Sequence, residues 1–236
     1  MKTPFTFVFR EITEKAELKH AFRMRYQACQ HSENKAFIRE NEQQIDIDGF
    51  DLHSKHFGFF REHEMVGYVR AIFPAKIYTN PLAEAMKAEY GTLIPQTMKE
   101  DYPFLSYENV PASHFEFKRT LEDNGDVICE ASRFIIHPRY QSSGAARLLI
   151  ESSLSTHIQH EDCSYVVINC CPTHERFYTR YGIKNIDDNR SYTTNGVEKI
   201  TLAISMSPAA ISEPYREYLL ELNNQYRQTQ QIVMTL

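Results

Sequence analysis

Several charged residues lie in stretches that otherwise resemble buried secondary structure. Glu130 and Arg133 interrupt the apolar, β-branched run CEASRFII (residues 129–136), and Arg25 lies on the apolar stripe of an expected helix. Arg70 ends the expected strand VGYVR. Because burial of an unpaired charge is strongly unfavourable, arginines in such patterns usually have a carboxylate or a ligand beside them. We therefore expect a network of ion pairs inside the protein.

The segment DIDGFD supplies carboxylates for such a network, in particular Asp48 and Asp51. Two acids and three arginines at these positions could bind a charged substrate. For any one of these residues, a purely structural role in an ion-pair network that ties the N-terminal helix to the sheet is at least as good an interpretation as a role in catalysis. The candidate substrate-binding residues are Arg25, Asp48, Asp51 and Arg70.

Glu130 and Arg133 are three residues apart in one expected strand. In a regular strand, side chains separated by an odd number of residues point to opposite faces of the sheet. Both can reach one site only if a β-bulge intervenes. Ser132, between them, is interpreted as a hydrogen-bonding strand residue rather than a nucleophile.

This strand leads into a turn with little side-chain bulk, QSSGAA (residues 141–146), and then into an expected helix. The first N–H groups of a helix are unpaired and its dipole favours anions, so a pyrophosphate could approach the backbone here. Arg139 and Arg147 flank the turn and could contact phosphate oxygens. Taken alone, the turn is more often an ordinary helix start. The Walker and dinucleotide-binding patterns, GxxxxGK[ST] and GxGxxG, are absent from the sequence.

Gln141, Gly144 and Ala146 match the pattern Q/R-x-x-G-x-G/A directly after a strand. This resembles the coenzyme A pyrophosphate loop of GNAT-superfamily acyltransferases. The donor-binding residues that the resemblance implies are Ile136, Arg139, Gln141, Ser142, Ser143, Gly144, Ala145 and Ala146. It also implies that Tyr178, in RFYTRYGI, protonates the departing thiolate, and packing beside Phe177 is the alternative for this tyrosine.

The ordered motifs R…DxFD…GxxR…ExSRF resemble one branch of this superfamily, the acyl-homoserine-lactone synthases and the N-acyl amino acid synthases. The residues on that branch's charged signature positions are Arg25, Asp48, Asp51, Arg70, Glu130 and Arg133. The stretch RYQACQ…DGFDLHSKHF…VGYVR is also similar to acyltransferases associated with bacterial PEP-CTERM/exosortase systems. Lactone synthases typically carry a tryptophan shortly after the first arginine, whereas this chain contains no Trp and has Cys29 where an aromatic residue is usual. We therefore favour an N-acyl amino acid synthase.

The resemblance implies transfer of a long acyl chain from acyl-coenzyme A or acyl carrier protein to the amine of an amino acid or similar small molecule. The amine must lose a proton before it attacks the thioester, and Glu130 is the candidate general base. Arg70 or Arg133 could hold the acceptor's carboxylate in a bidentate pair. The candidate catalytic residues are Glu130, Tyr178 and Arg133. No tightly bound cofactor is expected, and direct transfer is the simplest mechanism because GxSxG and Cys/His patterns are absent.

Three alternative functions stay open. They are an autoinducer synthase of the acyl-homoserine-lactone type, an acetyltransferase with a small acyl pocket, and a non-catalytic module that binds acyl thioesters. A small acyl pocket would leave the long segment 74–126 unexplained. We interpret this segment as an insertion that covers the substrate site and roofs an acyl tunnel.

We expect a single acyltransferase domain over residues 1–236, because no Gly-, Ser- or Pro-rich linker divides the chain. The resemblance implies an α+β, three-layer fold with a mixed, splayed central sheet flanked by helices. Hydrophobic patterning predicts strands at 5–11, 127–137, 165–169 and 199–206, a hairpin over 55–73, and helices at 14–30, 143–159, 172–183 and 212–230. The insertion should hold short helices near 81–89 and 114–122, and Gly67 should mark a close approach of two backbones.

Composition excludes several classes of partner. The net charge of -5, without blocks of like charge, argues against nucleic acid. The apolar runs are far shorter than the ~20 residues of a membrane helix, so no transmembrane segment is expected, and peripheral membrane contact is left open. Five cysteines, an odd number without a CxxC pair, suit a reducing cytoplasm. No metal site is expected, because the spacing of His53 and His56 sends their side chains to opposite faces of a strand.

Overall fold

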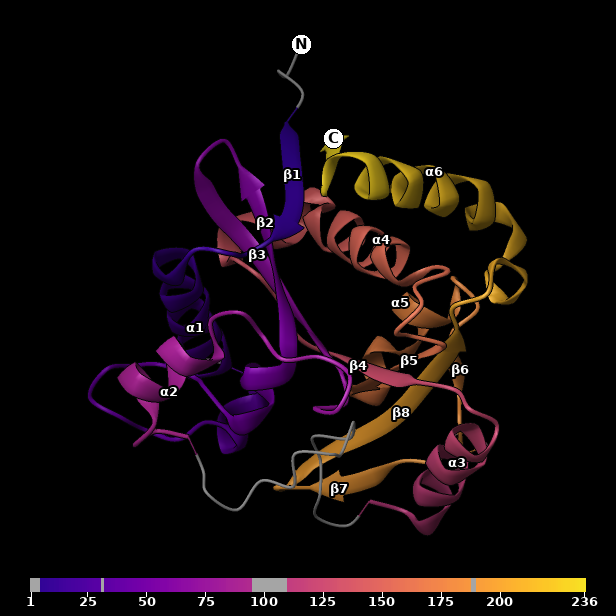
Figure 1. Ribbon diagram of the computed structural model, residues 1–236, viewed down its shortest axis with the longest axis horizontal. Helices are drawn as coiled ribbons and strands as arrows, with labels where there is room; N and C mark the ends of the chain where they lie inside the picture. The colour runs from indigo at the N-terminus through magenta and orange to yellow at the C-terminus, as the bar shows by residue number, and fades with distance from the viewer. Residues whose placement is uncertain (1–4, 31, 95–109, 188–189) are drawn as a thin grey trace.

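A mixed β-sheet is the framework of the molecule (Figure 1). The computed structural model describes residues 5–30, 32–94, 110–187 and 190–236. The strand order is β6-β8-β5-β4-β3-β2-β1-β9, and β7 pairs with β8 beside this path. The strands are β1 (Thr6–Glu11), β2 (Ser54–Arg61), β3 (Glu64–Ile72), β4 (Ile128–Ile136), β5 (Tyr165–Cys170), β6 (Lys184–Asn185), β7 (Tyr192–Thr194), β8 (Val197–Ser205) and β9 (Gln231–Thr235). Neighbouring strands are antiparallel, except that β4 and β5 are parallel.

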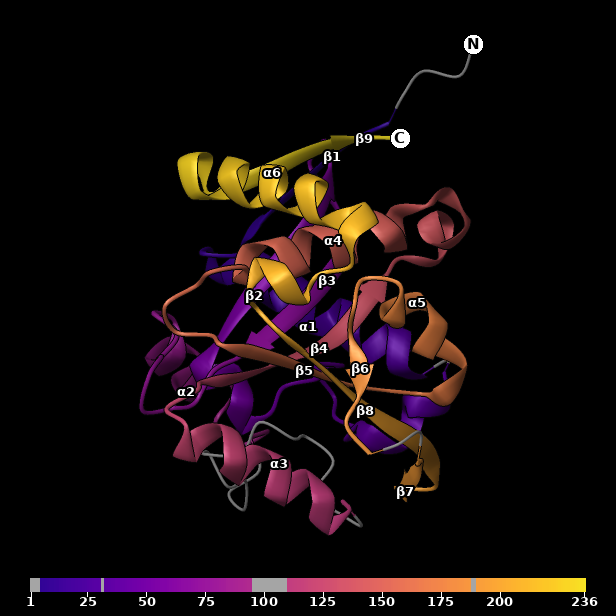
Figure 2. The same cartoon turned by 90° about the vertical axis from the view of Figure 1, so that its right-hand side faces the viewer.

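Helices cover both faces of the sheet. The α-helices are α1 (Lys15–Gln30), α2 (Ala83–Tyr90), α3 (Ala112–Asp123), α4 (Ala145–His157), α5 (Glu175–Thr179) and α6 (Glu213–Thr229). The 3-10 helices are η1 (Glu33–Phe37), η2 (Gly49–His53), η3 (Pro138–Ser143), η4 (Pro172–His174) and η5 (Pro208–Ala210). Figure 2 shows α4 and α6 stacked on one side of the sheet and α3 on the other. In the described ranges, we find no helix long and apolar enough to cross a bilayer.

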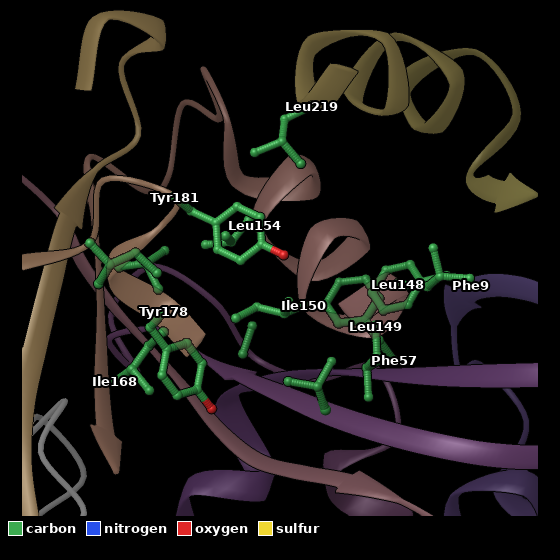
Figure 3. Packing of buried hydrophobic residues seen from close by; sticks show 14 of the residues in the cluster. Phe9, Phe57, Leu148, Leu149, Ile150, Leu154, Ile168, Tyr178, Tyr181 and Leu219 are labelled. Carbon is green, nitrogen blue, oxygen red and sulfur yellow. The ribbon is translucent and has the colours of Figure 1, made fainter. Parts of the chain in front are cut away.

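The largest core lies between the sheet and α4. Figure 3 shows Phe9 and Phe57, from β1 and β2, facing Leu148 and Leu149 of α4, with Leu219 of α6 on the far side of that helix. All five side chains are buried. Burial of each stabilises the fold by roughly 1.5–3 kcal/mol, which fixes α4 against the strands.

The opposite face carries two smaller cores. One joins Leu18 and Phe22 of α1 to Tyr68 of β3, and the other joins Leu121 of α3 to Val167 of β5. Helix α1 exposes its polar side and buries the apolar stripe predicted from the sequence, with Arg25 on the buried side. Helix α1 therefore directs a charged side chain, that of Arg25, toward this face of the sheet.

The predicted elements are confirmed with small changes of boundary. Helix α4 begins at Ala145 rather than Ser143, because the preceding residues Pro138–Ser143 form a 3-10 helix that starts with a proline. Helix α6 packs mainly against α4 rather than on the sheet, although Tyr226 reaches the ring of Phe57 in β2. Strands β6, β7 and β9 were not predicted.

The segment interpreted as an insertion contains both short helices that were predicted there. They are α2 and α3, and α3 packs against β4, β5 and β8 through Leu121. Residues 95–109 lie outside the described residues. The described parts of 74–126 supply none of the residues that line the cavity presented below, so the predicted roof over an acyl tunnel has no support from them.

Gly67 marks a close approach between β3 and β4, as predicted. A Cβ atom at this position would lie 2.8 Å from Ile136 Cδ1 and 3.1 Å from the Ile135 carbonyl oxygen. Such contacts are too short for a side chain, so glycine at this position allows β3 to pack closely against the end of β4, just before the loop that follows β4. The position of that loop depends on this contact.

Candidate active site

A cavity of about 370 Å³ opens where β4 and β5 separate. Pairing between the two strands covers Ile128–Ala131 and Tyr165–Ile168 and stops there, although both strands continue. Among the residues lining the cavity are Glu130, Ser132, Arg133, Phe134, Ile136 and Gln141 on the β4 side. The other walls include Cys29 and Phe37 from α1 and η1, and Asn169, Cys171, Tyr178 and Lys199. The splayed sheet expected from the sequence is therefore present.

A β-bulge at Arg133 brings two predicted catalytic residues into this cavity. Tyr68 of β3 pairs with Ile135, but Arg70 pairs with Ser132, so β4 carries one residue more than β3 over this interval. Arg133 has a φ of 55°, in the left-handed region that few residues other than glycine adopt. The bulge that the sequence required is confirmed, and Glu130 and Arg133 line the same cavity.

Arg133 is held in this backbone conformation by a carboxylate. Its Nε atom donates to Asp46 Oδ2 at 2.7 Å, and its Nη2 atom lies 3.5 Å from Asp48 Oδ2. A left-handed conformation is unfavourable for a residue with a Cβ, so the surroundings must compensate for it. The ion pair with Asp46 supplies that compensation and fixes the direction of the guanidinium.

The predicted ion-pair network lies directly behind Arg133. Arg25 donates to Asp46 at 3.0 Å and to Asp51 at 2.7 Å. Arg70 donates to Asp48 and Asp51, each at 2.7 Å, and through Nε to the hydroxyl of Ser132 at 3.0 Å. Arg25, Arg70 and Asp51 are completely buried. The network therefore connects α1, β3 and the segment before β2 to the bulged part of β4.

Local structure explains why two of these aspartates lie where they do. Asp48 is the N-cap of η2 and accepts from the Phe50 amide at 3.0 Å, while Asp51 accepts from the Asp48 amide at 2.8 Å. This is a capping box, so local hydrogen bonds at the start of η2 orient both carboxylates independently of the arginines. Both oxygens of Asp48, and Oδ1 of Asp51, accept from the guanidinium groups.

Charge pairing overcomes burial in this network. Burial alone would raise the pKa of Asp46, but the guanidinium groups of Arg133 and Arg25 hold it below its ordinary value. The pKa of Asp51 is likewise lowered by Arg25 and Arg70 in spite of its burial. Both acids are therefore ionised at neutral pH. Three arginines and three aspartates in contact carry no net charge, which makes their burial tolerable.

The predicted phosphate loop has the form expected of an anion site. Gly144 has a φ of 82°, which suits glycine, and helix α4 follows it directly. The Ser143 hydroxyl donates to the Tyr140 carbonyl oxygen at 2.7 Å, which leaves the start of α4 bounded by the small residues Ala145 and Ala146. The Ala145 amide donates to the Ser143 hydroxyl at 3.4 Å, and the Arg147 and Leu148 amides donate to the Gly144 carbonyl oxygen.

The residues around this loop differ in position. Ile136 and Gln141 line the cavity, with Gln141 Nε2 donating to the Ile136 carbonyl oxygen at 3.5 Å. Arg139 is exposed beside the loop. Arg147, which was expected to flank the loop, pairs with Glu151 one helical turn further on, at 3.4 Å. The backbone of Ser142 lies in η3.

Tyr178 of α5 lies on the wall opposite β4. Its ring lies beside Ile168, and Figure 3 shows the hydroxyl oxygen directed away from Tyr181 and α4. Burial, followed by the neighbouring thiols of Cys170 and Cys171, raises the pKa of Tyr178. The phenol therefore keeps its proton at neutral pH and is a hydrogen-bond donor at the cavity wall.

The four residues predicted to bind substrate are absent from the described lining of the cavity. They are Arg25, Asp48, Asp51 and Arg70. They lie one layer behind it, where they hold Arg133 and Ser132. The predicted catalytic residues Glu130, Tyr178 and Arg133 do line the cavity, and Glu130 is buried there, with 1% of its surface exposed.

Three residues of this site were not selected from the sequence. Asp46 belongs to the same DIDGFD segment, and its spacing from Asp48 and Asp51 fits neither strand nor helix periodicity, so only the fold reveals its contacts. Asn169 and Lys199 lie in the strands YVVINC and VEKITLAIS, where a polar residue within a largely apolar strand was the available signal. In the described part of the chain, no group of three or more His, Cys, Asp or Glu residues could hold a metal ion.

Comparison with protein families gives two matches. Residues 24–151 match the family model described as an acetyltransferase (GNAT) domain. Residues 106–205 match the family model described as N-acyl amino acid synthase FeeM. A search of curated proteins found no match. The predicted resemblance to GNAT acyltransferases related to N-acyl amino acid synthases is confirmed.

Solved structures with the same fold include three acyltransferases. The N-acyl amino acid synthase FeeM from uncultured soil microbes has a TM-score of 0.53 and 17% identity, over 94% of this chain and 99% of FeeM. The AHL synthase LasI has a TM-score of 0.54 and 16% identity, over 86% and 91%. The CoA-dependent acyl-homoserine lactone synthase BjaI, with MTA, has a TM-score of 0.57 and 12% identity, over 92% and 90%. The predicted GNAT-like fold is thus confirmed.

Proposed function

Because this chain belongs to the acetyltransferase (GNAT) domain family, we propose that it transfers a long acyl chain from a phosphopantetheine thioester to the amine of an amino acid. One observation carries the proposal. A single cavity at the gap between β4 and β5 has a buried carboxylate, Glu130, on one wall and a protonated phenol, Tyr178, on another. The match of residues 106–205 to the N-acyl amino acid synthase model favours an amino acid as acceptor.

The donor's phosphates bind at the start of α4 in this proposal. Gly144 is exposed and leads into the small residues Ala145 and Ala146, the side chain of Leu236 lies next to it, and the exposed residue Arg139 is close in sequence. From there the pantetheine arm enters the slot past Gln141 and Ile136, which line the cavity. Coenzyme A and acyl carrier protein present the same arm, so either can serve as donor.

Glu130 takes a proton from the acceptor amine, directly or through one water. The free amine then attacks the thioester carbonyl, a carbon–nitrogen bond forms, and negative charge develops on the carbonyl oxygen. Among the described residues, pairing of β4 with β5 ends at Ala131, and backbone N–H groups of β4 beyond that point can stabilise this charge, at about 3 kcal/mol per donor. Collapse of the intermediate breaks the carbon–sulfur bond.

Tyr178 donates a proton to the departing sulfur. Tyr178 lines the cavity, and its raised pKa keeps the proton in place until negative charge appears on the sulfur. After the products leave, Glu130 releases its proton to solvent and Tyr178 takes one up from solvent, which restores the starting state. The products are an N-acyl amino acid and a free thiol.

The ion-pair network positions the catalytic wall. Arg70 holds the Ser132 hydroxyl at 3.0 Å and Asp46 holds Arg133 at 2.7 Å, on the two residues that form the bulge. Fixing the bulge fixes the backbone donors on its far side, since both belong to one short stretch of β4. In this proposal Arg25, Asp48, Asp51 and Arg70 act through Arg133 and Ser132.

A small apolar void lies beside the cavity, toward α4, and this is where we place the start of the acyl chain. It shares Phe134 and Tyr178 with the main cavity, and is otherwise lined mainly by aliphatic residues such as Ala131, Ile150 and Leu154. Its volume, about 20 Å³, is enough for one or two carbon atoms as it stands.

An assay with four arms tests this function. Long-chain and acetyl thioesters, each on coenzyme A and on acyl carrier protein, are incubated with a mixture of amino acids, and the products are identified by mass spectrometry. The proposal predicts long-chain amides. Acetyl amides alone would indicate a small-acyl acetyltransferase, and bound donor without product would indicate a binding module.

A lactone synthase is tested in the same assay by adding S-adenosylmethionine. The fold similarity to LasI and BjaI is compatible with that activity, but the chain lacks any tryptophan. Release of acyl-homoserine lactone, with no acyl amino acid, would contradict the proposed function.

A further inference from the structure

The sheet places an acidic side chain on one wall of the cavity, and an amide and a basic side chain on another. Glu130 of β4 pairs with Val167 of β5, and Asn169 follows two residues later, so the side chains of Glu130 and Asn169 point to the same face. Asn169 pairs with Thr201 of β8, and Lys199 lies two residues before it on the same face. An acid thus faces the cavity from β4, and an amide and an ammonium face it from β5 and β8.

The amide of Asn169 is oriented by its neighbours. Its Oδ1 atom accepts from the Tyr192 hydroxyl at 2.9 Å and from the Thr201 hydroxyl at 2.6 Å. Neither donor belongs to the cavity lining, so the Nδ2 end points to the other side, where Asn169 lines the cavity. In the described residues, Nδ2 is buried and has no hydrogen-bond partner. Buried amide donors are rarely left unpaired, which points to a ligand oxygen as the missing acceptor.

Lys199 brings positive charge to the same wall. It is 6% exposed and lines the cavity, its Nζ atom lies 3.4 Å from Cys171 Sγ, and its ammonium lies 5.4 Å from the centre of the Phe37 ring. Diagonal neighbours on an antiparallel pair, such as Asn169 and Lys199, are about 7–8 Å apart, within reach of long side chains. A carboxylate between them would accept from both.

The arginines are less suited to this task. Arg25 and Arg70 are completely buried and bonded to aspartates, and Arg133 directs Nε and Nη2 to Asp46. An acceptor carboxylate at any of these groups would compete with an existing ion pair in a neutral network. Lys199 and Asn169 place a cation and an oriented donor on the wall of the cavity itself.

We propose that the carboxylate of the acceptor amino acid binds between Asn169 Nδ2 and Lys199 Nζ, which places its amine toward Glu130. This inference rests on the proposed function and narrows its substrate class. The site takes α-amino acids with a free carboxylate, and discriminates against the decarboxylated amine. The carboxylate of the amino acid then faces Lys199 and Asn169, and its amine faces Glu130 on the other wall.

Two substitutions test the site with little change of shape. Asn169→Asp keeps an oxygen that accepts from Tyr192 and Thr201 but replaces the donor with a negative charge, and Lys199→Met removes the ammonium. Each should raise KM for the amino acid by roughly 10- to 100-fold, the range expected for one hydrogen bond to a charged group. KM for the acyl donor should not change. Lys87→Met, at an exposed lysine of α2, is the matched control.

A comparison of substrates separates binding of the carboxylate from damage to the fold. The same enzymes are assayed with the amino acid and with the amine that lacks its carboxylate, and thermal unfolding midpoints are measured for each variant. The wild type should prefer the amino acid by at least roughly tenfold in kcat/KM, and both variants should lose this preference while retaining activity toward the amine.

Two outcomes overturn the inference, and they differ from failure of the proposed function. If the folded variants keep the wild-type preference for the carboxylate, the site is elsewhere while the enzyme is still an N-acyltransferase. If the wild type does not distinguish the two substrates, no carboxylate site exists. If the wild type acylates neither substrate with any donor, the proposed function itself is wrong, and the inference falls with it.

Discussion

The reaction depends on the protonation of two side chains that face one cavity. Glu130 must be able to accept a proton, and Tyr178 must hold one until the thiolate leaves. The raised pKa of Tyr178 follows from burial and from the neighbouring thiols of Cys170 and Cys171, and burial likewise raises the pKa of Cys170, to about 12. The Cys170 thiol is therefore protonated at neutral pH and is a poor nucleophile, which supports direct transfer.

Replacing Glu130 with glutamine removes the proposed base and keeps the size of the side chain. Glu130→Gln should retain donor binding, while the acylation rate falls by at least ~100-fold, a typical contribution of general-base catalysis. Single-turnover kinetics and donor affinity measured on the same sample separate the two effects. Glu221→Gln, at an exposed position on α6, is the control. Unchanged turnover in Glu130→Gln would remove Glu130 from the mechanism.

Replacing Tyr178 with phenylalanine removes the hydroxyl that protonates sulfur. Tyr178→Phe should lower kcat by roughly 100-fold, with little change in KM for the donor, because the ring and its packing remain. A thioester with a more acidic thiol needs less help to leave and should recover part of the rate. The acid role is wrong if the loss is the same for both thiols.

At the scale of the elements, a strained bulge and a buried network depend on each other. The bulge places Arg133 in the left-handed region, and Asp46 binds its guanidinium from the segment between η1 and η2. The bulge could be predicted, since Glu130 and Arg133 could share a site in no other way. Asp46 could not be selected, because the turn geometry before η2 decides which of the aspartates in DIDGFD meet the arginines.

Asp46→Asn tests this dependence. The substitution leaves Arg25 and Arg133 with less negative charge beside them in a buried site, and breaking such a pair should lower the free energy of unfolding by about 3 kcal/mol. Urea denaturation measures the change. Asp123→Asn, at the exposed end of α3, should change stability by less than about 0.5 kcal/mol. Equal effects of the two substitutions would show that the network does not stabilise the fold.

At the scale of the whole molecule, the order of the elements was readable from the sequence because the periodicities of α1, β4, β5 and α6 are strong. Strand β9 was missed even though it alternates, with Ile232 and Met234 buried and Val233 exposed. It is short and follows a long helix directly, so the alternation covers too few residues to stand out. Its pairing with β1 depends on a contact between distant parts of the chain, which local patterns do not contain.

Acid should destabilise the whole fold through buried histidines. Burial lowers the pKa of His157 to about 4, from an ordinary value near 6.5, so the unfolded state binds a proton in this range while the folded state does not. Stability contributed by the neutral ring is therefore present above pH 6.5 and is lost as the pH falls from about 6.5 to about 4, by roughly 3 kcal/mol. His56, with its pKa also lowered to about 4, acts in the same direction.

Urea denaturation at a series of pH values checks this prediction. His157→Gln should be less stable at pH 7 but should show a shallower loss of stability between pH 6.5 and pH 4 than the wild type. His63→Gln, at an exposed turn between β2 and β3, should follow the wild-type slope. Identical slopes for all three proteins would mean that His157 does not control acid stability.

The central claim is that an acyl thioester occupies the slot between β4 and β5 beside Glu130. A crystal structure with a non-reactive thioether analogue of a long-chain acyl-coenzyme A tests it most directly. The account predicts the diphosphate against the amides after Gly144, and the atoms that replace the thioester between Glu130 and Tyr178. A slot left empty, or an analogue bound at another place on the protein, would contradict it.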